Sequence, residues 1–74
     1  MITFKSDTEL EVVTNFDEAT DTITGMETET FKAGEKVDAE IIDDRDEKGE
    51  LFVDLQFGDG SVAYGVQRAC FDVI

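Results

Sequence analysis

Apolar and polar residues alternate most regularly in residues 51–66, which have the sequence LFVDLQFGDGSVAYGV. Apolar side chains occupy every second position from 51 to 57, which is the period of a half-buried β-strand. Gly58, Asp59 and Gly60 follow, and such residues tolerate the backbone angles of a tight turn. The alternation then resumes from 62 to 66. The pattern predicts an antiparallel hairpin that places its large apolar side chains on one face.

Two turn positions fit this hairpin, and each of them sets a different register. A turn at Asp59-Gly60 gives the cross-strand pairs Phe57–Val62, Leu55–Tyr64 and Val53–Val66. A turn one residue earlier pairs Leu55 with Val62 and Val53 with Tyr64. Both registers place Tyr64 on the apolar face, so we expect it in the core with its hydroxyl group at the rim.

Further strands are predicted on both sides of this hairpin. Shorter alternating patterns occur at residues 1–5, 8–15, 20–30, 36–43 and 71–74. The stretch 20–30 (TDTITGMETET) is rich in Thr and Glu, a composition with high β-propensity and low hydrophobicity. It is therefore expected to form an exposed or edge strand that bends at Gly25.

The strand around Val37, Ala39 and Ile41 is the cleanest of these, and the three apolar residues are expected on its buried face. Residues 67–70 (QRAC) read as a short connector with one 3₁₀ turn. No stretch favours a full helix. The sequence therefore predicts a single all-β domain over residues 1–74, a small barrel of five to seven short antiparallel strands.

The second half of the chain, residues 31–74, resembles the Src-homology-3 family in the order and spacing of its turns. Phe31-Lys32-Ala33-Gly34-Glu35 looks like the diverging turn of that family, and residues 43–50 (DDRDEKGE) look like its variable acidic loop. The central hairpin, the 3₁₀ turn and a closing strand follow in the same order. The resemblance implies a barrel of the Src-homology-3 type, to which the first half adds a strand or a hairpin.

The aromatic residues with which that family binds proline-rich peptides are missing here. The family has a tryptophan after the acidic loop, where this chain has Leu51 and Phe52. Gln67 and Cys70 replace the proline and the tyrosine at the 3₁₀ turn, and the Ala-Leu-Tyr-Asp-Tyr start is not recognisable. The resemblance therefore extends to the barrel and not to the proline-peptide site.

The chain is strongly acidic, with 19 acidic residues against 6 basic ones and a net charge of −13. Direct binding to nucleic-acid phosphates or to an anionic membrane surface requires clustered Lys and Arg, so neither is expected. Three interpretations of the acidity stay open. The acidity favours solubility, including adaptation to a salty cytoplasm; it attracts a basic protein; or it mimics nucleic-acid phosphates.

Catalytic chemistry finds little support in the residues. The chain has no histidine, so Cys70 has no imidazole partner, and neither Ser6 nor Ser61 has a visible base. Carboxylates are abundant, but they must cluster by chance when about a quarter of all residues are acidic. A non-enzymatic protein without a cofactor is expected.

The acidic stretch 43–50 offers oxygen ligands that suit Ca²⁺ or Mg²⁺. With Gly49 at the sixth position of an EF-hand loop, Lys48 takes the fifth position and Leu55 the twelfth, where Glu is required. Cysteine and histidine clusters for zinc are also missing. A solvated loop is therefore expected rather than a metal site.

The chain shows no run of about 18 apolar residues and no basic-then-apolar start, so neither a membrane helix nor a signal peptide is expected. Its single cysteine, Cys70, lies between apolar neighbours and is expected to be a buried, reduced thiol. These features favour a cytoplasmic location.

Two isolated aromatic residues are candidates for binding a partner. Phe52 shares its strand phase with Asp54 and Gln56, so the alternation that buries Val53 is expected to turn Phe52 outward. Phe16 is similarly isolated among polar residues. The expected binding surface combines Phe52, Asp54 and Gln56 with the acidic residues Asp43, Asp44, Asp46, Glu47 and Glu50. The alternative is that Phe52 packs under the N-terminal strands.

The expected function is a small protein-interaction module that binds a basic protein surface. The alternative is a nucleic-acid mimic that inhibits a DNA- or RNA-binding protein, for which Glu27, Glu29, Asp38 and Glu40 would form a stripe on adjacent strands. The sequence leaves the oligomeric state open.

Overall fold

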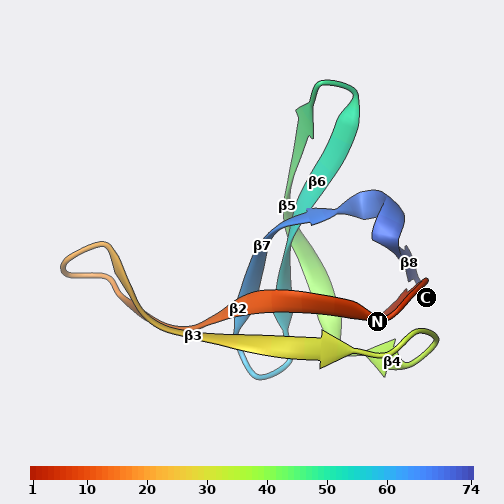
Figure 1. Cartoon of the computed structure of the whole chain (residues 1–74). Coiled ribbons are helices and arrows are strands. Elements are labelled where there is room, and N and C mark those ends of the chain that lie inside the picture. The colour runs from red at the N-terminus through yellow and green to blue at the C-terminus, as the bar shows by residue number, and fades with distance from the viewer.

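The computed structural model describes residues 1–74, and its elements follow one another as eight β-strands and one 3₁₀ helix. They are β1 (Ile2–Phe4), β2 (Thr8–Asp17), β3 (Thr22–Phe31), β4 (Lys36–Val37), β5 (Ala39–Glu47), β6 (Glu50–Phe57), β7 (Val62–Gln67), η1 (Arg68–Cys70) and β8 (Phe71–Val73). The strands form two antiparallel sheets, one in the order β4-β1-β8 and the other in the order β3-β2-β7-β6-β5 (Figure 1). The all-β fold predicted from the alternation is therefore confirmed.

The architecture differs from the predicted barrel in two respects. The sheets do not close, because β3 and β5 are the free edges of the five-stranded sheet and do not pair with each other. The predicted strand at residues 36–43 is divided, so there are eight strands instead of five to seven. Its first part, β4, pairs with β1, and its second part, β5, pairs with β6. The break falls at Asp38, whose carbonyl accepts a hydrogen bond from the Gly58 amide (3.0 Å).

The core lies between the two sheets and contains four phenylalanine rings. Phe4 lies 5.2 Å from Phe31 and 5.9 Å from Phe71, measured between ring centroids, and Phe31 stacks on Phe57 at 5.4 Å. Phe4 and Phe71 are almost completely buried. The aliphatic part of the core consists of Ile2, Val12, Ala39, Val53, Leu55, Ala63 and Val66. Because the rings come from four different strands, this aromatic cluster ties both sheets together.

A β-bulge in β7 corrects the predicted register of the central hairpin. The pair Val53–Val66 is confirmed, but Leu55 pairs with Ala63, so two β7 residues lie opposite Asp54. Those residues are Tyr64 and Gly65, and Gly65 has a positive φ of 69° that favours glycine. The bulge shifts the strand phase by one residue. Ala63 is therefore buried, and Tyr64, predicted in the core, is 57% exposed.

The predicted acidic loop is instead a continuous hairpin. β5 runs through to Glu47 and β6 starts at Glu50, so only Lys48 and Gly49 form the turn. Both have positive φ angles, 52° and 82°, as a two-residue type I′ turn requires. The outer half of this hairpin rises away from the three-stranded sheet (Figure 1).

Two apolar residues of this hairpin were expected in the core and are exposed. They are Ile41 (41%) and Leu51 (43%). Ile42 is an extra residue that bulges β5 beside Ile41, and Leu51 lies in the part of β6 that extends past the core. Both side chains lack an opposing layer, so the alternation alone overestimated the buried length of these strands.

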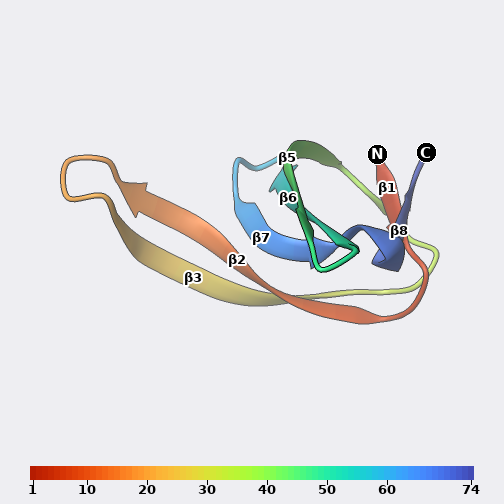
Figure 2. The same cartoon turned by 90° about the horizontal axis from the view of Figure 1, so that it is seen from above.

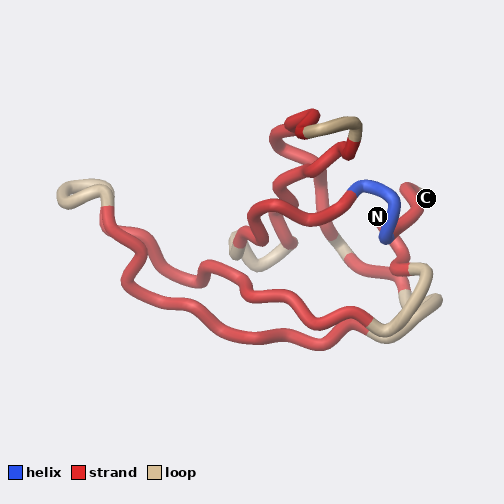
Figure 3. Tube along the Cα trace, turned by 45° about the horizontal axis from the view of Figure 1, so that its top comes forward, coloured by secondary structure: helices blue, strands red, loops and turns tan.

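The β2–β3 hairpin projects from the body as a long arm (Figures 1 and 3). Seen from above, the remaining strands curl beside the root of this arm and leave its tip free (Figure 2). β3 is an edge strand, as predicted for the Thr- and Glu-rich stretch. The 3₁₀ turn and the closing strand β8 are also confirmed, while Cys70, expected to be buried, is half-buried.

Candidate interaction surface

The outer face of the five-stranded sheet, opposite the core, carries the three predicted residues of β6. That strand has no bulge of its own, so Phe52, Asp54 and Gln56 alternate with buried Val53 and Leu55. The shared face predicted from the sequence is therefore present. The three side chains differ, however, in how far they reach solvent.

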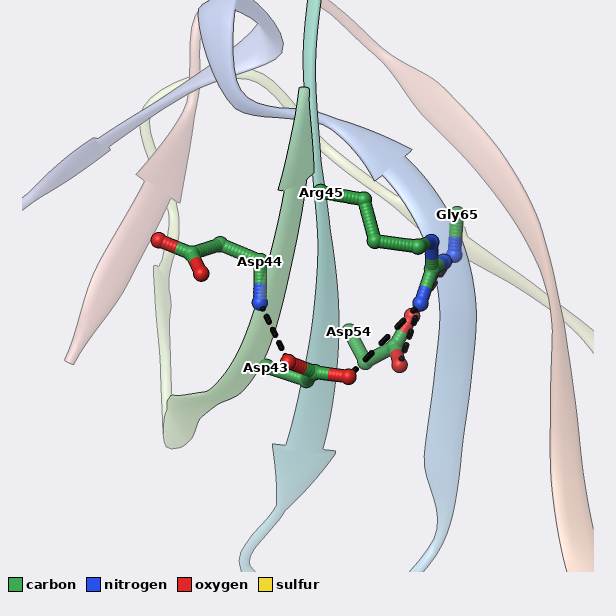
Figure 4. A network of polar contacts seen from close by, with 5 residues as sticks. All are labelled: Asp43, Asp44, Arg45, Asp54 and Gly65. Carbon is green, nitrogen blue, oxygen red and sulfur yellow. Dashed lines mark hydrogen bonds and ion pairs between the residues drawn. The ribbon is translucent and has the colours of Figure 1, made fainter. Parts of the chain in front are cut away.

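Asp54 is buried, with 5% of its surface exposed, where an exposed residue was expected. The Arg45 guanidinium on β5 covers it and donates two hydrogen bonds, from Nη2 to Oδ1 (2.9 Å) and from Nη1 to Oδ2 (3.0 Å) (Figure 4). The Gly65 amide donates a third, to Oδ1 (3.0 Å). Asp54 therefore stabilises the outer face by linking β5, β6 and β7, and its carboxylate is not free to bind a partner.

Two bulges create this arrangement. The bulge in β5 places Asp43 directly opposite Asp54, and the bulge in β7 brings the Gly65 amide to the Asp54 carboxylate. Two carboxylates at opposite positions of a ladder repel each other. Arg45 offsets this repulsion because it reaches diagonally across to Asp54 and also lies 3.9 Å from Asp43 Oδ2.

The hydrogen bonds from Arg45 hold the pKa of Asp54 below its usual range, and the Gly65 amide adds to this, although burial acts in the opposite direction. The same pair raises the pKa of Arg45. Both groups therefore stay ionised at neutral pH, and their charges cancel within the sheet.

The lowered pKa of Asp54 gives the stability a defined pH dependence. The Asp54 carboxyl binds its proton less tightly in the folded state than in the unfolded chain. The ionised carboxylate therefore stabilises the fold fully above the unfolded pKa of about 3.9, and this stabilisation disappears as the pH falls through the lower folded pKa. In urea unfolding from pH 7 to pH 3, we expect the stability difference between the wild type and Asp54→Asn to stay constant above about pH 5 and to shrink below about pH 4. Asp43→Asn is the control. A difference that grows toward low pH would contradict the assigned pKa direction.

Phe52 lies between the two interpretations made from the sequence. Its side chain is half-buried on the outer face, and its cross-strand neighbours are Arg45 on β5 and Gln67 on β7. It belongs to the face of the sheet opposite the core. Gln56, further along β6, is exposed between Glu40 and Val62.

The remaining predicted residues form an acidic rim along the β5–β6 hairpin. They are Asp43, Asp44, Asp46, Glu47 and Glu50, and all of them are exposed. Asp43, Glu47 and Glu50 lie on the same face as Phe52, whereas Asp44 and Asp46 pair with Val53 and Leu51 and therefore lie on the opposite face. Glu47 and Glu50 are direct cross-strand neighbours beside the turn. The cations of this hairpin are Arg45, which is occupied by Asp54, and Lys48 at the turn, so the rim keeps a strongly negative charge.

Sequence reasoning missed an apolar row that crosses the outer face. Val13 on β2 pairs with Met26 on β3 and with Val62 on β7, and Val62 pairs with Gln56 on β6. Direct partners in a ladder share a face, so Met26, Val13 and Val62 form one apolar row across three strands, which ends at Gln56 on the fourth. The adjacent apolar pair of Val13 and Val12 was the available signal, since two consecutive buried residues require cover on both faces.

A cleft of about 510 Å³ lies between the β5–β6 turn and η1. It contains Lys5 and Arg68, but both cations already have partners. Arg68 donates a hydrogen bond to the Phe71 carbonyl (2.8 Å) and stacks over the Phe71 ring, and Lys5 lies 3.8 Å from Asp72. The Lys5–Asp72 pair is exposed and weak, and Arg68 keeps its charge, so the cleft is lined by two cations that their neighbours orient.

The stripe of carboxylates expected for a nucleic-acid mimic does not lie on adjacent strands. Glu27 and Glu29 belong to β3, and Glu40 belongs to β5, which are opposite edges of the five-stranded sheet. Asp38 lies in the break between β4 and β5. Three strands thus separate the two halves of the predicted stripe.

The structure contains no helix that is long and apolar enough to cross a membrane. Compared with protein-family models, with curated proteins and with solved structures, the chain gives no significant match.

Proposed function

We propose that this chain is a small, non-enzymatic protein-interaction module that binds a basic protein through the outer face of its five-stranded sheet. The observation that carries the proposal is Phe52, a half-buried aromatic residue on the outer face of the sheet, beside an acidic rim. The binding surface consists of Phe52 and Gln56 with Asp43, Glu47 and Glu50, and Asp54 supports it from within. Asp44 and Asp46 add negative charge from the opposite face of the hairpin.

Aromatic anchors supply much of the binding energy at protein interfaces, while rim charges steer encounter and select partners. Phe52 provides the anchor here. The surrounding carboxylates attract Lys and Arg side chains, and the Arg45–Asp54 pair fixes the sheet beneath them. A partner with an apolar pocket and a basic rim complements this surface.

The proposal extends to the relationship with the Src-homology-3 family and to location. A diverging turn at residues 31–35, a hairpin, a 3₁₀ turn and a closing strand occur in the family's order, which supports an open variant of that fold with another binding chemistry. The unpaired thiol of Cys70 supports a reducing, cytoplasmic environment.

The test compares Phe52→Ala with Leu51→Ala, the adjacent residue on the opposite side of the same strand. A partner is first isolated from the native lysate at about 0.15 M salt, where screening acts beyond about 8 Å. We expect Phe52→Ala to weaken binding at least tenfold and Leu51→Ala by less than threefold in titration calorimetry. Because Phe52 is only half-buried, its loss should lower the free energy of unfolding by about 1 kcal/mol, below the range for a core phenylalanine.

Equal binding of both variants and the wild type would remove Phe52 as the anchor. A loss of about 3–5 kcal/mol in unfolding free energy would instead make it a structural residue. Competition by DNA for the captured protein would favour the nucleic-acid mimic over this proposal.

A further inference from the structure

The inner half of the β2–β3 arm is fixed to the body, with Val12 buried and Phe31 in the aromatic cluster, and only the half beyond Val13 projects freely (Figure 1). Along β2, the ladder with β7 consists of the single pair Val13–Val62, whereas the ladder with β3 extends from Thr8 to Asp17. Beyond Val13, the two strands of the arm pair only with each other. All three views of the chain show this part standing clear of the other strands (Figures 1, 2 and 3).

One face of the arm carries exposed apolar side chains. Phe16 and Ile23 are direct cross-strand partners near the tip and are 45% and 44% exposed; Met26, the partner of Val13, is 50% exposed. One ladder pair, Asn15–Gly25, separates these two pairs, so they lie on the same face. The arm therefore continues the apolar row of the outer face away from the body.

Glycine is required at the pair between them. A Cβ atom on Gly25 would lie 2.8 Å from the Thr14 Oγ1 atom and 3.2 Å from the Asn15 Cβ atom. Thr14 is an extra residue in β2 and Thr24 an extra residue in β3, and these opposite bulges cancel. The register is thereby restored, which keeps Phe16 opposite Ile23.

The outer side of β3 is an open strand edge. β3 is ten residues long and ends the sheet, so one side of its backbone has no neighbouring strand. Such an edge is a template for an additional strand, which gains main-chain hydrogen bonds there.

The negative charge of the arm determines which kind of strand can pair with the open edge of β3. Residues 6–31 contain no Lys or Arg. Their acidic residues are Asp7, Glu9, Glu11, Asp17, Glu18, Asp21, Glu27 and Glu29. Glu27 and Glu29 lie on the edge strand itself, so a second copy of this chain would bring like charges together. A basic strand would neutralise them.

We infer that the open edge of β3 is a docking site for an extended, basic segment of a partner protein, which adds to the sheet as an antiparallel strand. This inference rests on the proposed function and assigns it a second surface, distinct from the Phe52 surface. An antiparallel strand meets Glu29, Thr28, Glu27 and Met26 in that order. The partner segment therefore has the pattern basic, any residue, basic, apolar.

The test uses synthetic ten-residue peptides with the full chain. One peptide carries this pattern with Lys and Ile, a second has the same composition with the two Lys moved by one position, and a third has Glu in place of Lys. Chemical shifts of the backbone amides locate the peptide, and titration gives its affinity. We expect the first peptide to bind at least tenfold more tightly than the other two, with the largest shifts from Met26 to Thr30.

Charge-reversed variants separate the two edges of the sheet. Glu27→Lys with Glu29→Lys should transfer the preference to the Glu peptide, while Asp44→Lys with Asp46→Lys on the opposite edge, β5, and on the face away from Phe52, should leave the ranking unchanged. Far-UV circular dichroism confirms that both variants fold.

Three outcomes would overturn the inference. If the Lys peptide binds but the β5 variant or Phe52→Ala abolishes binding, the arm is not the site, and the proposed function stands. If sedimentation shows that the wild type dimerises through β3, a second copy occupies the edge. If neither basic peptides nor a basic protein binds to any surface, the inference and the proposed function both fail.

Discussion

Phe4→Ala should lower the free energy of unfolding by about 3–5 kcal/mol, the usual loss when a buried phenylalanine ring is removed. Phe4 is 1% exposed, and its ring contacts both Phe31 and Phe71 at the junction of the two sheets. A domain of this length has a total stability of only about 4–11 kcal/mol. The variant should therefore lose a large part of its stability and unfold at a clearly lower urea concentration than the wild type.

Phe16→Ala is the matched control, since it removes the same ring from the arm. Phe16 is 45% exposed and lies outside the core, so the expected loss is below about 1 kcal/mol. Urea unfolding followed by far-UV circular dichroism measures both changes. Similar losses for the two variants would contradict a core confined to the space between the sheets.

Local signals were sufficient to predict most strands. Alternation located the central hairpin, and the Gly-Asp-Gly turn fixed its approximate centre, because both depend on residues close together in the sequence. The edge position of β3 followed from its Thr and Glu content. The 3₁₀ turn at η1 was predicted for the short connector 67–70, and the resemblance to the Src-homology-3 turn order agreed with it.

The bulges could not be predicted in the same way. A bulge in β7 is stabilised by the hydrogen bond from the Gly65 amide to Asp54, eleven positions earlier, and by the left-handed backbone of Gly65. Nothing in the sequence around Tyr64 indicates that interaction. Because one extra residue reverses the phase of a strand, a single missed bulge moved Tyr64 from the predicted core to the surface.

The candidate site was likewise predicted where it depends on neighbouring residues and missed where it depends on distant strands. The strand phase of β6 correctly placed Phe52, Asp54 and Gln56 on one face, since that strand is regular. The prediction that Asp54 is exposed was wrong, because Arg45 on another strand covers it. The β2–β3 arm was missed as a surface, although Phe16 had been noted, because its projection depends on the absence of an opposing layer.

Asp54→Ala should lower the free energy of unfolding by about 2–3 kcal/mol, because it removes three hydrogen bonds to a charged group and leaves the Gly65 amide without its acceptor. The loss stays below that for a fully buried ion pair, since 41% of the Arg45 side chain is exposed and the freed guanidinium can turn to water. The expected effect is therefore second only to that of the core phenylalanine.

Asp43→Ala provides the control on the same face, directly opposite Asp54. Asp43 is exposed and its contact with Arg45 is 3.9 Å long, so the expected change is within about 0.5 kcal/mol. A double-mutant cycle with Arg45→Ala should show coupling to Asp54 and almost none to Asp43. If both aspartates couple equally to Arg45, the arginine interacts with nearby carboxylates without a specific partner. The Arg45–Asp54 pair would then not hold the outer face beside Phe52 in a fixed geometry.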